Sequence, residues 1–209
     1  MRFLIVDDHA MIRGGVRRLL EEAYVSAAVA EAAGGEEALT RIAREPFDLV
    51  TLDLSLPGLG GLELLGRLAR LRPGLRVLVL SMHAEREFAV RCLEAGAAGY
   101  ITKERGPDEL LAAIARIMSG KRYVSPDFAE TLVDAAGSTG TAPAHARLSQ
   151  REFLVLRLLA KGHSNAEVAA RLNLSPKTVS TYRARVLEKL DLANNIELAR
   201  YCTEHGLID

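Results

Sequence analysis

The stretch Phe3-Leu-Ile-Val-Asp-Asp8 decides the fold class of the first part of the chain, because four apolar residues end there in two adjacent carboxylates. A second apolar run, Leu49–Leu52, also ends in a carboxylate, that of Asp53. Three further runs of the same kind are Ala27–Ala30, Val77–Leu80 and Ala98–Ile101. Short runs that are almost wholly apolar are typical of parallel strands covered on both faces. We therefore predict five parallel strands.

Amphipathic stretches of helical length separate these apolar runs. The predicted helices are His9–Ala23, Gly35–Arg44, Leu59–Arg70, Glu85–Ala95 and Pro107–Met118. Pro107 suits the first turn of a helix, and the acidic residues Asp108 and Glu109 behind it favour a helix N-terminus. Five strands that alternate with five helices predict an α/β domain built on a parallel five-stranded sheet.

Polar side chains gather at the carboxyl ends of these strands, where open α/β sheets bind their ligands. Asp7, Asp8 and Asp53 would repel one another in one pocket unless a cation compensated them, and their hard oxygen atoms suit Mg²⁺. Ser81 and Lys103 follow the fourth and fifth strands and can reach the same pocket. A carboxylate nucleophile, a metal ion, a hydroxyl and a lysine together can accept and hold a phosphoryl group.

A simpler interpretation treats each acid as a helix cap or a loop residue, and it suffices for Asp7 or Asp53 taken alone. It does not explain five polar groups at the same end of four strands. No cysteine stands there as an alternative nucleophile, and His9 and His83 already fall in the following loop or helix. The glycine-rich loop Pro57–Gly61 lacks the Gly-Lys-Ser/Thr ending of a P-loop, so we interpret it as a turn.

The composition changes after residue 125, and we predict a first domain over residues 1–125 and a linker over residues 126–147. The small, polar stretch Ala135–Ala144 cannot bury enough surface to offset its chain entropy. Pro126 to Asp134 is expected to continue as a short helix. Residues 148–209 then show a purely helical pattern of four short helices, the last over Asn194–Glu204, which predicts a small all-α bundle. Its helix starts are marked by Ser149-Gln-Arg-Glu152, Ser164-Asn-Ala-Glu167 and Ser175-Pro176.

The helix Pro176–Leu190 has two distinct faces when it is wound at 100° per residue. One face is a core stripe of Val179, Tyr182, Val186 and Leu190. The other is short, polar and basic, and a helix over Ser164–Arg171 precedes it in the helix-turn-helix pattern that places the second helix in the major groove. The candidate DNA contacts are Lys177, Thr178, Ser180, Thr181, Arg183, Ala184 and Arg185. An ordinary two-helix corner with a solvated face remains an alternative at this point.

The net charge of the 209-residue chain is zero, from 27 basic and 27 acidic groups, and by itself this counts against a nucleic-acid partner. The charge is unevenly divided along the chain. Residues 1–125 carry 17 basic and 17 acidic groups. Residues 126–147 carry one basic and three acidic groups, and residues 148–209 carry nine basic and seven acidic groups. The helical part therefore has a modest excess of +2, which predicts weak DNA binding by one copy and a need for dimerisation.

The cysteine count and the hydropathy also exclude some classes of protein. Two cysteines are too few for a disulfide scaffold or, alone, a tetrahedral zinc site. No apolar run approaches the ~20 residues of a membrane span. Charge follows the first apolar run too early for a secretory signal. We therefore expect a cytoplasmic protein with no membrane partner.

Residues 1–125 resemble the receiver domain of bacterial two-component response regulators. The matching motifs are Ile5-Val-Asp-Asp8, Leu52-Asp-Leu-Ser-Leu-Pro-Gly58, Leu80-Ser81 and Tyr100-Ile-Thr-Lys103. The resemblance implies a flavodoxin-like (βα)5 fold with Asp53 as the phosphoacceptor. It implies that Asp8, Asp53 and the backbone carbonyl of Ser55 bind Mg²⁺ directly, that Asp7 helps through water, and that Lys103 pairs with the phosphoryl group. Ser81 and Tyr100 would be the switch pair. One departure is Gly60, where the family often has an aspartate that caps the next helix.

Residues 148–209 resemble the LuxR-type helix-turn-helix domain. The matching motifs are Leu148-Ser-Gln-Arg-Glu152, Ala160-Lys-Gly-His-Ser-Asn165, Glu167-Val-Ala169, Leu174-Ser175, Lys177-Thr-Val179 and Leu187-Glu-Lys-Leu190. The order of receiver, linker and helical tail resembles the NarL/FixJ class of response regulators. In that class the last helix can form a dimer contact, here through Ile196, Ala199 and Cys202. The chain departs from the class at Ala166 and Ser180, where lysine is common, and at Tyr182, where histidine is common.

The resemblance implies a transcription factor rather than an enzyme, one that receives a phosphoryl group from a sensor histidine kinase and binds double-stranded DNA as a homodimer. RNA polymerase would be a further partner. Three alternatives are a DNA-binding protein with a receiver that is not phosphorylated, an output through protein contacts alone, and an aspartyl-phosphate phosphatase of the haloacid dehalogenase type. The phosphatase class has a second acid two residues after the nucleophile, whereas this chain has Ser55 at that place.

Overall fold

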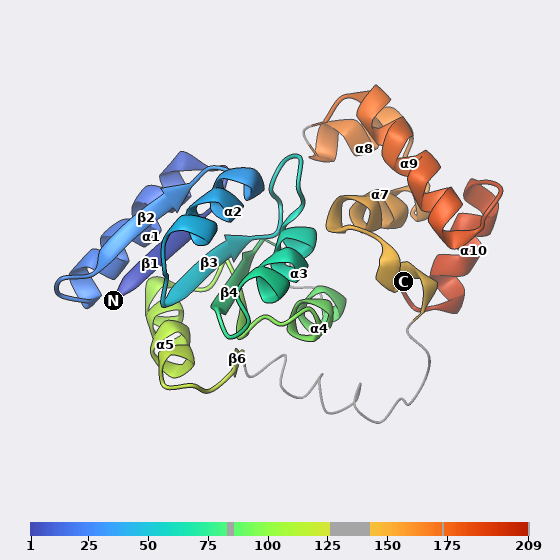
Figure 1. Ribbon diagram of the computed structural model, residues 1–209. Coiled ribbons are helices and arrows are strands. Elements are labelled where there is room, and N and C mark those ends of the chain that lie inside the picture. Colours follow the sequence, from blue (N-terminus) through green and yellow to red (C-terminus); the bar gives the residue numbers. More distant parts are fainter. Residues whose placement is uncertain (83–85, 126–142, 173, 209) are drawn as a thin grey trace. The chain divides into compact units, whose positions relative to one another are not determined.

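The predicted apolar runs form one parallel sheet in the computed structural model, which describes residues 1–82, 86–125, 143–172 and 174–208 (Figure 1). The strands are β1 (Arg2–Val6), β2 (Ala28–Ala32), β3 (Leu49–Asp53), β4 (Arg76–Ser81), β5 (Gly99–Thr102) and β6 (Tyr123–Val124). Their order is β2-β1-β3-β4-β5-β6, and every neighbouring pair is parallel. The five expected strands are confirmed. The edge strand β6 adds two residues, too few to give a periodic signal in the sequence.

The helices between the strands lie close to the predicted ranges. They are α1 (Ala10–Ala23), α2 (Gly35–Arg44), α3 (Gly61–Leu71), α4 (Arg86–Glu94) and α5 (Pro107–Met118). Phe3, Ile5 and Leu78 of the sheet share one core with residues of α1 and α5. The alternate residues of the same strands are buried too, and all five residues of β3 are inaccessible. Burial on both faces explains why the strands are nearly continuous apolar runs, and the predicted α/β class is confirmed.

The strand order places the site, because the direction of winding reverses between β1 and β3. The two strands pair in register, with Val6 beside Leu52. The residue after each of these is a carboxylate, so Asp7 and Asp53 meet at the carboxyl edge of the sheet. This is the switch point at which doubly wound sheets bind their ligands.

Gly61, the first residue of α3, packs against the end of β3 so closely that no side chain fits. A Cβ atom there would lie 2.4 Å from the carbonyl oxygen of Asp53 and 2.5 Å from Leu54 Cα. We expect Gly61→Ala to lower the free energy of unfolding of the receiver by about 1–3 kcal/mol, because the backbone would have to move. Gly66→Ala in the same helix is the matched control, since its Cβ would meet nothing within 4 Å. Urea unfolding checks both, and an equal effect of the two substitutions would contradict this account.

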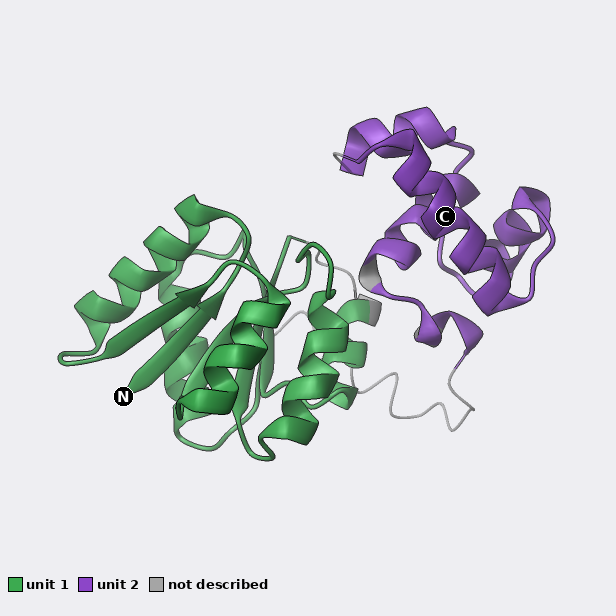
Figure 2. Ribbon diagram, turned by 45° about the horizontal axis from the view of Figure 1, so that its top comes forward, with its two compact units in different colours: residues 1–139 green, residues 140–209 purple. Residues whose placement is uncertain are grey.

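The second unit is all helical, as predicted. Its helices are the short 3-10 helix η1 (Ala144–Arg147), α7 (Gln150–Ala160), α8 (Asn165–Leu172), α9 (Pro176–Leu190) and α10 (Asn195–Glu204). The chain divides into two compact units, residues 1–139 and 140–209, coloured green and purple in Figure 2. The predicted caps are present: Ser149 and Glu152 form a reciprocal capping box, and the Ser175 hydroxyl accepts from the backbone N–H of Thr178 at 3.1 Å.

Only the end of the predicted linker falls within the described residues, and the short helix expected over residues 126–134 lies outside them. Ala144–Arg147, which we assigned to the linker, form η1, and His145 of this turn is buried. Its Nδ1 lies 2.8 Å from the hydroxyl oxygen of Tyr201 in α10. The last residues before position 148 therefore pack as part of the helical unit, while the linker boundaries themselves stay a prediction.

Candidate phosphoacceptor site and nucleic-acid interface

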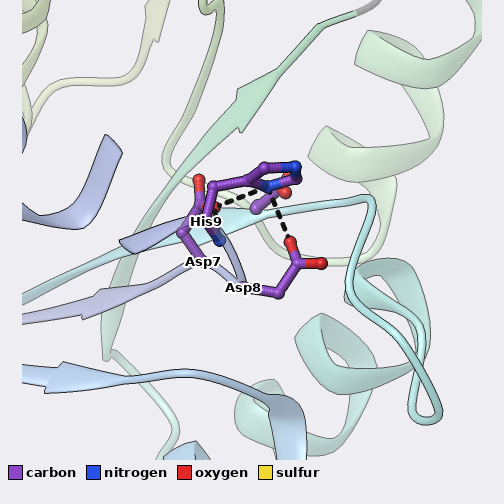
Figure 3. A group of neighbouring side chains, drawn as sticks. Asp7, Asp8 and His9 are labelled. Atoms are coloured by element: carbon purple, nitrogen blue, oxygen red, sulfur yellow. Dashed lines mark hydrogen bonds and ion pairs between the residues drawn. The ribbon is translucent and has the colours of Figure 1, made fainter. Parts of the chain in front are cut away.

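Three carboxylates and one imidazole meet at the carboxyl ends of β1 and β3. One ligand atom from each of Asp7, Asp8, His9 and Asp53 lies within 4.8 Å of the others. Asp7 and Asp53 are buried, with 2% and 1% of their surface accessible, whereas Asp8 is exposed. Figure 3 shows Asp7, Asp8 and His9 at the end of the strand, with the imidazole close to both carboxylates. The acidic pocket predicted from the sequence thus exists as a group of neighbouring side chains.

Lys103 brings a positive charge into this pocket from the end of β5. Its Nζ lies 2.5 Å from Asp7 Oδ2 and 3.0 Å from Asp53 Oδ2, and its side chain is 7% exposed. The backbone N–H of Lys103 donates to the Ser81 carbonyl oxygen at 2.7 Å, which fixes the lysine beside the end of β4. A buried lysine between two carboxylates balances their repulsion and leaves the pocket with excess negative charge.

Asp53 is less well hydrogen-bonded than its burial would require. Its Oδ1 accepts the backbone N–H of Ser55 at 3.0 Å. Its buried Oδ2 has no hydrogen bond of good geometry, although the Lys103 ammonium lies near it. Burial raises the pKa of the Asp53 carboxyl and the Asp7 charge adds to this, against the opposing effects of Lys103 and the Ser55 N–H. A buried acceptor without a donor is a place where a cation or a donor can bind.

The raised pKa of Asp53 has a consequence for stability. A carboxyl whose pKa is higher in the folded than in the unfolded chain stabilises the fold below its unfolded pKa, and this is lost as the pH rises through the folded pKa. At neutral pH without a divalent cation, Asp53→Asn should therefore raise the melting temperature, because it removes the buried charge. The gain should shrink as the pH is lowered to where Asp53 is protonated. Thermal unfolding in EDTA at several pH values measures it, and a lower melting temperature at pH 7 would contradict it.

His9 belongs to this group although the sequence argument set it aside. Its Nδ1 lies 3.2 Å from Asp7 Oδ1 and 2.9 Å from Asp8 Oδ1, and its backbone N–H donates to Asp7 Oδ1 at 2.7 Å. Its position directly after two acids was the available signal. The predicted helix His9–Ala23 begins one residue too early: α1 starts at Ala10, so His9 stays at the strand end. His83 lies outside the described residues.

The switch residues are both buried. Ser81 ends β4 and Tyr100 lies in β5, and neither has measurable exposure. The Tyr100 ring thus lies inside the domain. Ser55 is placed by its N–H contact with Asp53, and the predicted role of its carbonyl oxygen as a metal ligand stays a prediction.

The donor set fits a small hard cation. Oxygen atoms from three carboxylates converge from two strands, and Mg²⁺ prefers such ligands together with water. One of the acids is exposed, which leaves an open side for water and for a phosphodonor. The cluster is of the acidic kind typical of Mg²⁺ binding in receivers.

The helix α9 presents most of the predicted DNA contacts to solvent. Val179, Val186 and Leu190 are buried and Tyr182 is half-buried, as expected for the core stripe. The exposed candidates are Lys177, Ser180, Thr181, Ala184 and Arg185, and the half-buried ones are Thr178 and Arg183. The hydroxyls of Ser180 and Thr181 donate to carbonyl oxygens one turn back, at 3.0 and 3.1 Å. Both hydroxyl oxygens keep the capacity to accept a further hydrogen bond.

Two further contacts on this surface were not predicted. Asn165 Nδ2, at the start of α8, donates to Ser180 Oγ in α9 at 3.1 Å, so a residue of α8 lies beside the helix with the predicted DNA contacts. Arg183 Nε donates to Asn195 Oδ1 at 2.7 Å, which ties this candidate to the start of α10. Both contacts join helices at sequence separations that no local pattern reveals. Asn165 is thus an additional candidate for contact with DNA.

The three residues proposed for a dimer contact do not share one environment. Ile196 is 82% exposed, Ala199 is half-buried and Cys202 is fully buried in its own unit. Cys202 therefore has no surface to offer to a second copy. Cys92 is buried as well, and burial raises the pKa of its thiol to about 12, as expected of an unreactive packed cysteine.

Among the residues that the structure describes, no helix has both the length and the apolar character needed to cross a bilayer.

Two family models match the chain, and together they cover most of it. Residues 3–115 match the response regulator receiver domain, and residues 146–202 match the bacterial regulatory proteins of the luxR family. The carboxylate pocket lies in the first match and α9 in the second. Membership of the receiver family decides against the phosphatase alternative.

Relatives at full length show the same pairing of domains. The response regulator UvrY of Escherichia coli K12 is 37% identical over 205 residues, 98% of this chain and 94% of the relative. The response regulator GacA of Pseudomonas aeruginosa is 38% identical over 212 residues, which are 100% of this chain and 98% of the relative. A solved structure of two RcsB dimers bound to two parallel DNAs has 28% identity and a TM-score of 0.61, covering 97% of this chain and 98% of RcsB. The chain therefore belongs to the NarL/FixJ class of two-component response regulators, in which a receiver domain precedes a LuxR-type DNA-binding domain.

Proposed function

We propose that Asp53 accepts a phosphoryl group from a sensor histidine kinase, and that this modification controls DNA binding by a dimer of the chain. The observation that carries the proposal is the state of the Asp53 carboxylate. It is buried among other acids, one oxygen has no hydrogen bond of good geometry, and the Lys103 ammonium lies 3.0 Å away. A carboxylate held in this way is available as a nucleophile. The Lys103 ammonium beside it can pair with the negative charge of the phosphoryl group.

The residues around Asp53 have distinct roles in the transfer. A carboxylate oxygen of Asp53 attacks the phosphorus atom, and the bond from phosphorus to the kinase histidine breaks. Lys103 moves its ion pair from the carboxylates to a phosphoryl oxygen. Asp7, Asp8 and Asp53, with the carbonyl oxygen of Ser55, would hold Mg²⁺, which when bound neutralises the charge on the phosphoryl oxygens.

The DNA-binding role of α9 follows from its surface and its class. Lys177 and Arg185 would contact phosphates, and the short side chains Ser180, Thr181 and Ala184 let the backbone come close to base edges. RcsB binds DNA as dimers in its solved structure, which supports a dimer here, with Ile196 and Ala199 as the accessible candidates on α10. We place the protein in the cytoplasm, and RNA polymerase is a further proposed partner.

Ser81 should couple phosphorylation to DNA binding. Ser81 ends β4 and its backbone carbonyl accepts the N–H of Lys103, so its hydroxyl is at the strand end where it can bond to a phosphoryl oxygen. We expect the phosphorylated wild type to bind a duplex selected from a random pool more tightly than the unphosphorylated protein. Ser81→Ala should still be phosphorylated but should lose that difference.

The measurement is a titration of fluorescent duplex with and without acetyl phosphate and Mg²⁺, with the phosphorylated fraction read by intact mass. Thr51→Ala is a matched control, because Thr51 is another buried hydroxyl residue of the sheet but lies two residues before the end of β3. Unchanged coupling in Ser81→Ala would remove this residue from the switch. If the wild type bound DNA equally in both states, the alternative of a receiver that does not control binding would hold.

A further inference from the structure

A cavity of about 380 Å³ lies at the end of the receiver sheet opposite to Asp53. Its lining includes Arg76, the first residue of β4, and Ala97 and Ala98, which precede β5. Since all strands are parallel, the amino ends of β4 and β5 are remote from the carboxyl ends that hold the phosphoacceptor. We call this hollow the basic cavity, for the reason that follows.

Four cations line the basic cavity, and none of the carboxylates in the described part of the chain does. The cations are Arg72, Arg76, Lys121 and Arg122. Arg72 follows α3 and Arg76 begins β4, while the other two follow α5, so two separate segments bring positive charge to one hollow. Like charges repel one another, and an anion bound among these cations would lower the free energy of the group.

These cations differ from most others in the receiver, which have acidic partners. Arg13 and Arg17 both pair with Glu31, and Lys103 pairs with Asp7. By contrast, within the described part of the chain Arg76, Lys121 and Arg122 have no ion pair. The Arg72 guanidinium donates only to the carbonyl oxygens of Ile42 and Ala43, at 3.3 and 3.4 Å.

Attraction to a helix C-terminus accounts for Arg72, whose guanidinium donates to the last turn of α2, but not for Arg76, Lys121 and Arg122. Basic residues in the last turn of a helix are stabilised by the helix dipole, and in α3 and α5 these residues are Arg70 and Arg116. Neither of them lines the cavity. Arg76 is in a strand, and Lys121 and Arg122 lie in the segment between α5 and β6.

We propose that the basic cavity binds a small phosphorylated molecule of the nucleoside di- or triphosphate class. Guanidinium groups present planar pairs of donors that match phosphate oxygens, and four cations suit a ligand with several negative charges. The lining also includes the apolar residues Ala69, Pro73, Leu75 and Ala98, which are exposed or half-buried and offer a surface for an uncharged ring. The volume is within the range of small-molecule sites, about 300–1,000 Å³.

Calorimetric titration of the full chain with ATP in EDTA tests the proposal, because chelation keeps the carboxylate pocket from binding the nucleotide through a metal ion. We expect binding of one ATP per chain, with adenosine alone giving no signal. The double variant Arg76→Gln/Lys121→Gln should weaken ATP binding by about tenfold or more for each cation removed. Arg70→Gln, an exposed arginine of α3 outside the cavity, should leave the affinity unchanged.

Three outcomes would overturn the proposal. The first is no heat of ATP binding at millimolar concentration, and the second is an equal loss in Arg70→Gln. The third is a loss in Lys177→Gln with none in the cavity variant, which would place the nucleotide on the DNA-binding helix. Pyrophosphate that bound as tightly as ATP would contradict the nucleoside part. A circular dichroism spectrum and a melting temperature like those of the wild type would show that the receiver of the cavity variant is folded.

Discussion

Replacing Asp53 by asparagine is expected to abolish incorporation of a phosphoryl group from acetyl phosphate in the presence of Mg²⁺. The wild-type chain should gain one phosphoryl group, whereas an amide in place of the carboxylate cannot attack phosphorus. The effect is complete because Asp7 and Asp8 are not aligned as substitutes: Asp7 is held by Lys103 and His9, and Asp8 points to the exposed side of the pocket. Intact mass spectrometry after a short incubation measures the gain directly.

Two controls make this result specific. Glu63→Gln removes an exposed carboxylate of α3 that takes no part in the pocket, and it should be phosphorylated like the wild type. Chelation of Mg²⁺ should abolish the gain of phosphoryl mass in the wild type and in Glu63→Gln. An Asp53→Asn protein that still gained the mass of a phosphoryl group would show that another residue is the phosphoacceptor, and the assignment of Asp53 would be wrong.

The second large effect concerns DNA. The double variant Lys177→Gln/Arg185→Gln should weaken DNA binding by at least about a hundredfold, because a dimer would lose four charge-assisted contacts to phosphates. Both side chains are exposed on α9, and no ion pair within the described residues engages them. The remaining cations of this helix are less available: Lys189 lies 2.6 Å from the buried Glu152, and Arg183 is bound to Asn195.

Salt dependence separates phosphate contacts from a general loss of folding. The logarithm of wild-type affinity should fall linearly with the logarithm of salt concentration, and the slope of the double variant should be shallower by about one for each lost phosphate contact. Arg18→Gln/Arg70→Gln changes the charge equally on the exposed receiver surface and should leave the slope unchanged. A wild-type affinity that did not respond to salt would exclude α9 as the DNA-binding element.

The basic cavity and the carboxylate pocket lie at opposite ends of the same strands. Strands β4 and β5 begin at the cavity, and their last residues, Ser81 and Thr102, lie beside Lys103. A ligand that ordered the amino ends of these strands would therefore act on the elements that contain the switch residues. The calorimetric test of the cavity does not depend on phosphorylation, so either conclusion can fail without the other.

Local patterns determined most of the fold. The apolar runs ending in Asp7 and Asp53 predicted two strands of a parallel sheet. A strand buried on both faces has no exposed face, so polar residues do not alternate with apolar ones along it. The capping boxes at Ser149 and Ser164 predicted helix starts that the structure confirms. The resemblance then supplied roles for single residues, such as Ser81 and Tyr100, that no pattern could give.

The sequence by itself determined the order of the elements, the two-domain organisation and the gathering of acids at strand ends, because these depend on periodicity and on chain neighbours. Only the tertiary structure decided which side chains touch. It placed Lys103 between Asp7 and Asp53, put His9 in the pocket, buried Cys202 and brought Asn165 to Ser180. Such contacts join residues far apart in the chain, and they depend on strand order and on helix packing. Neither of these is encoded in any single stretch of residues.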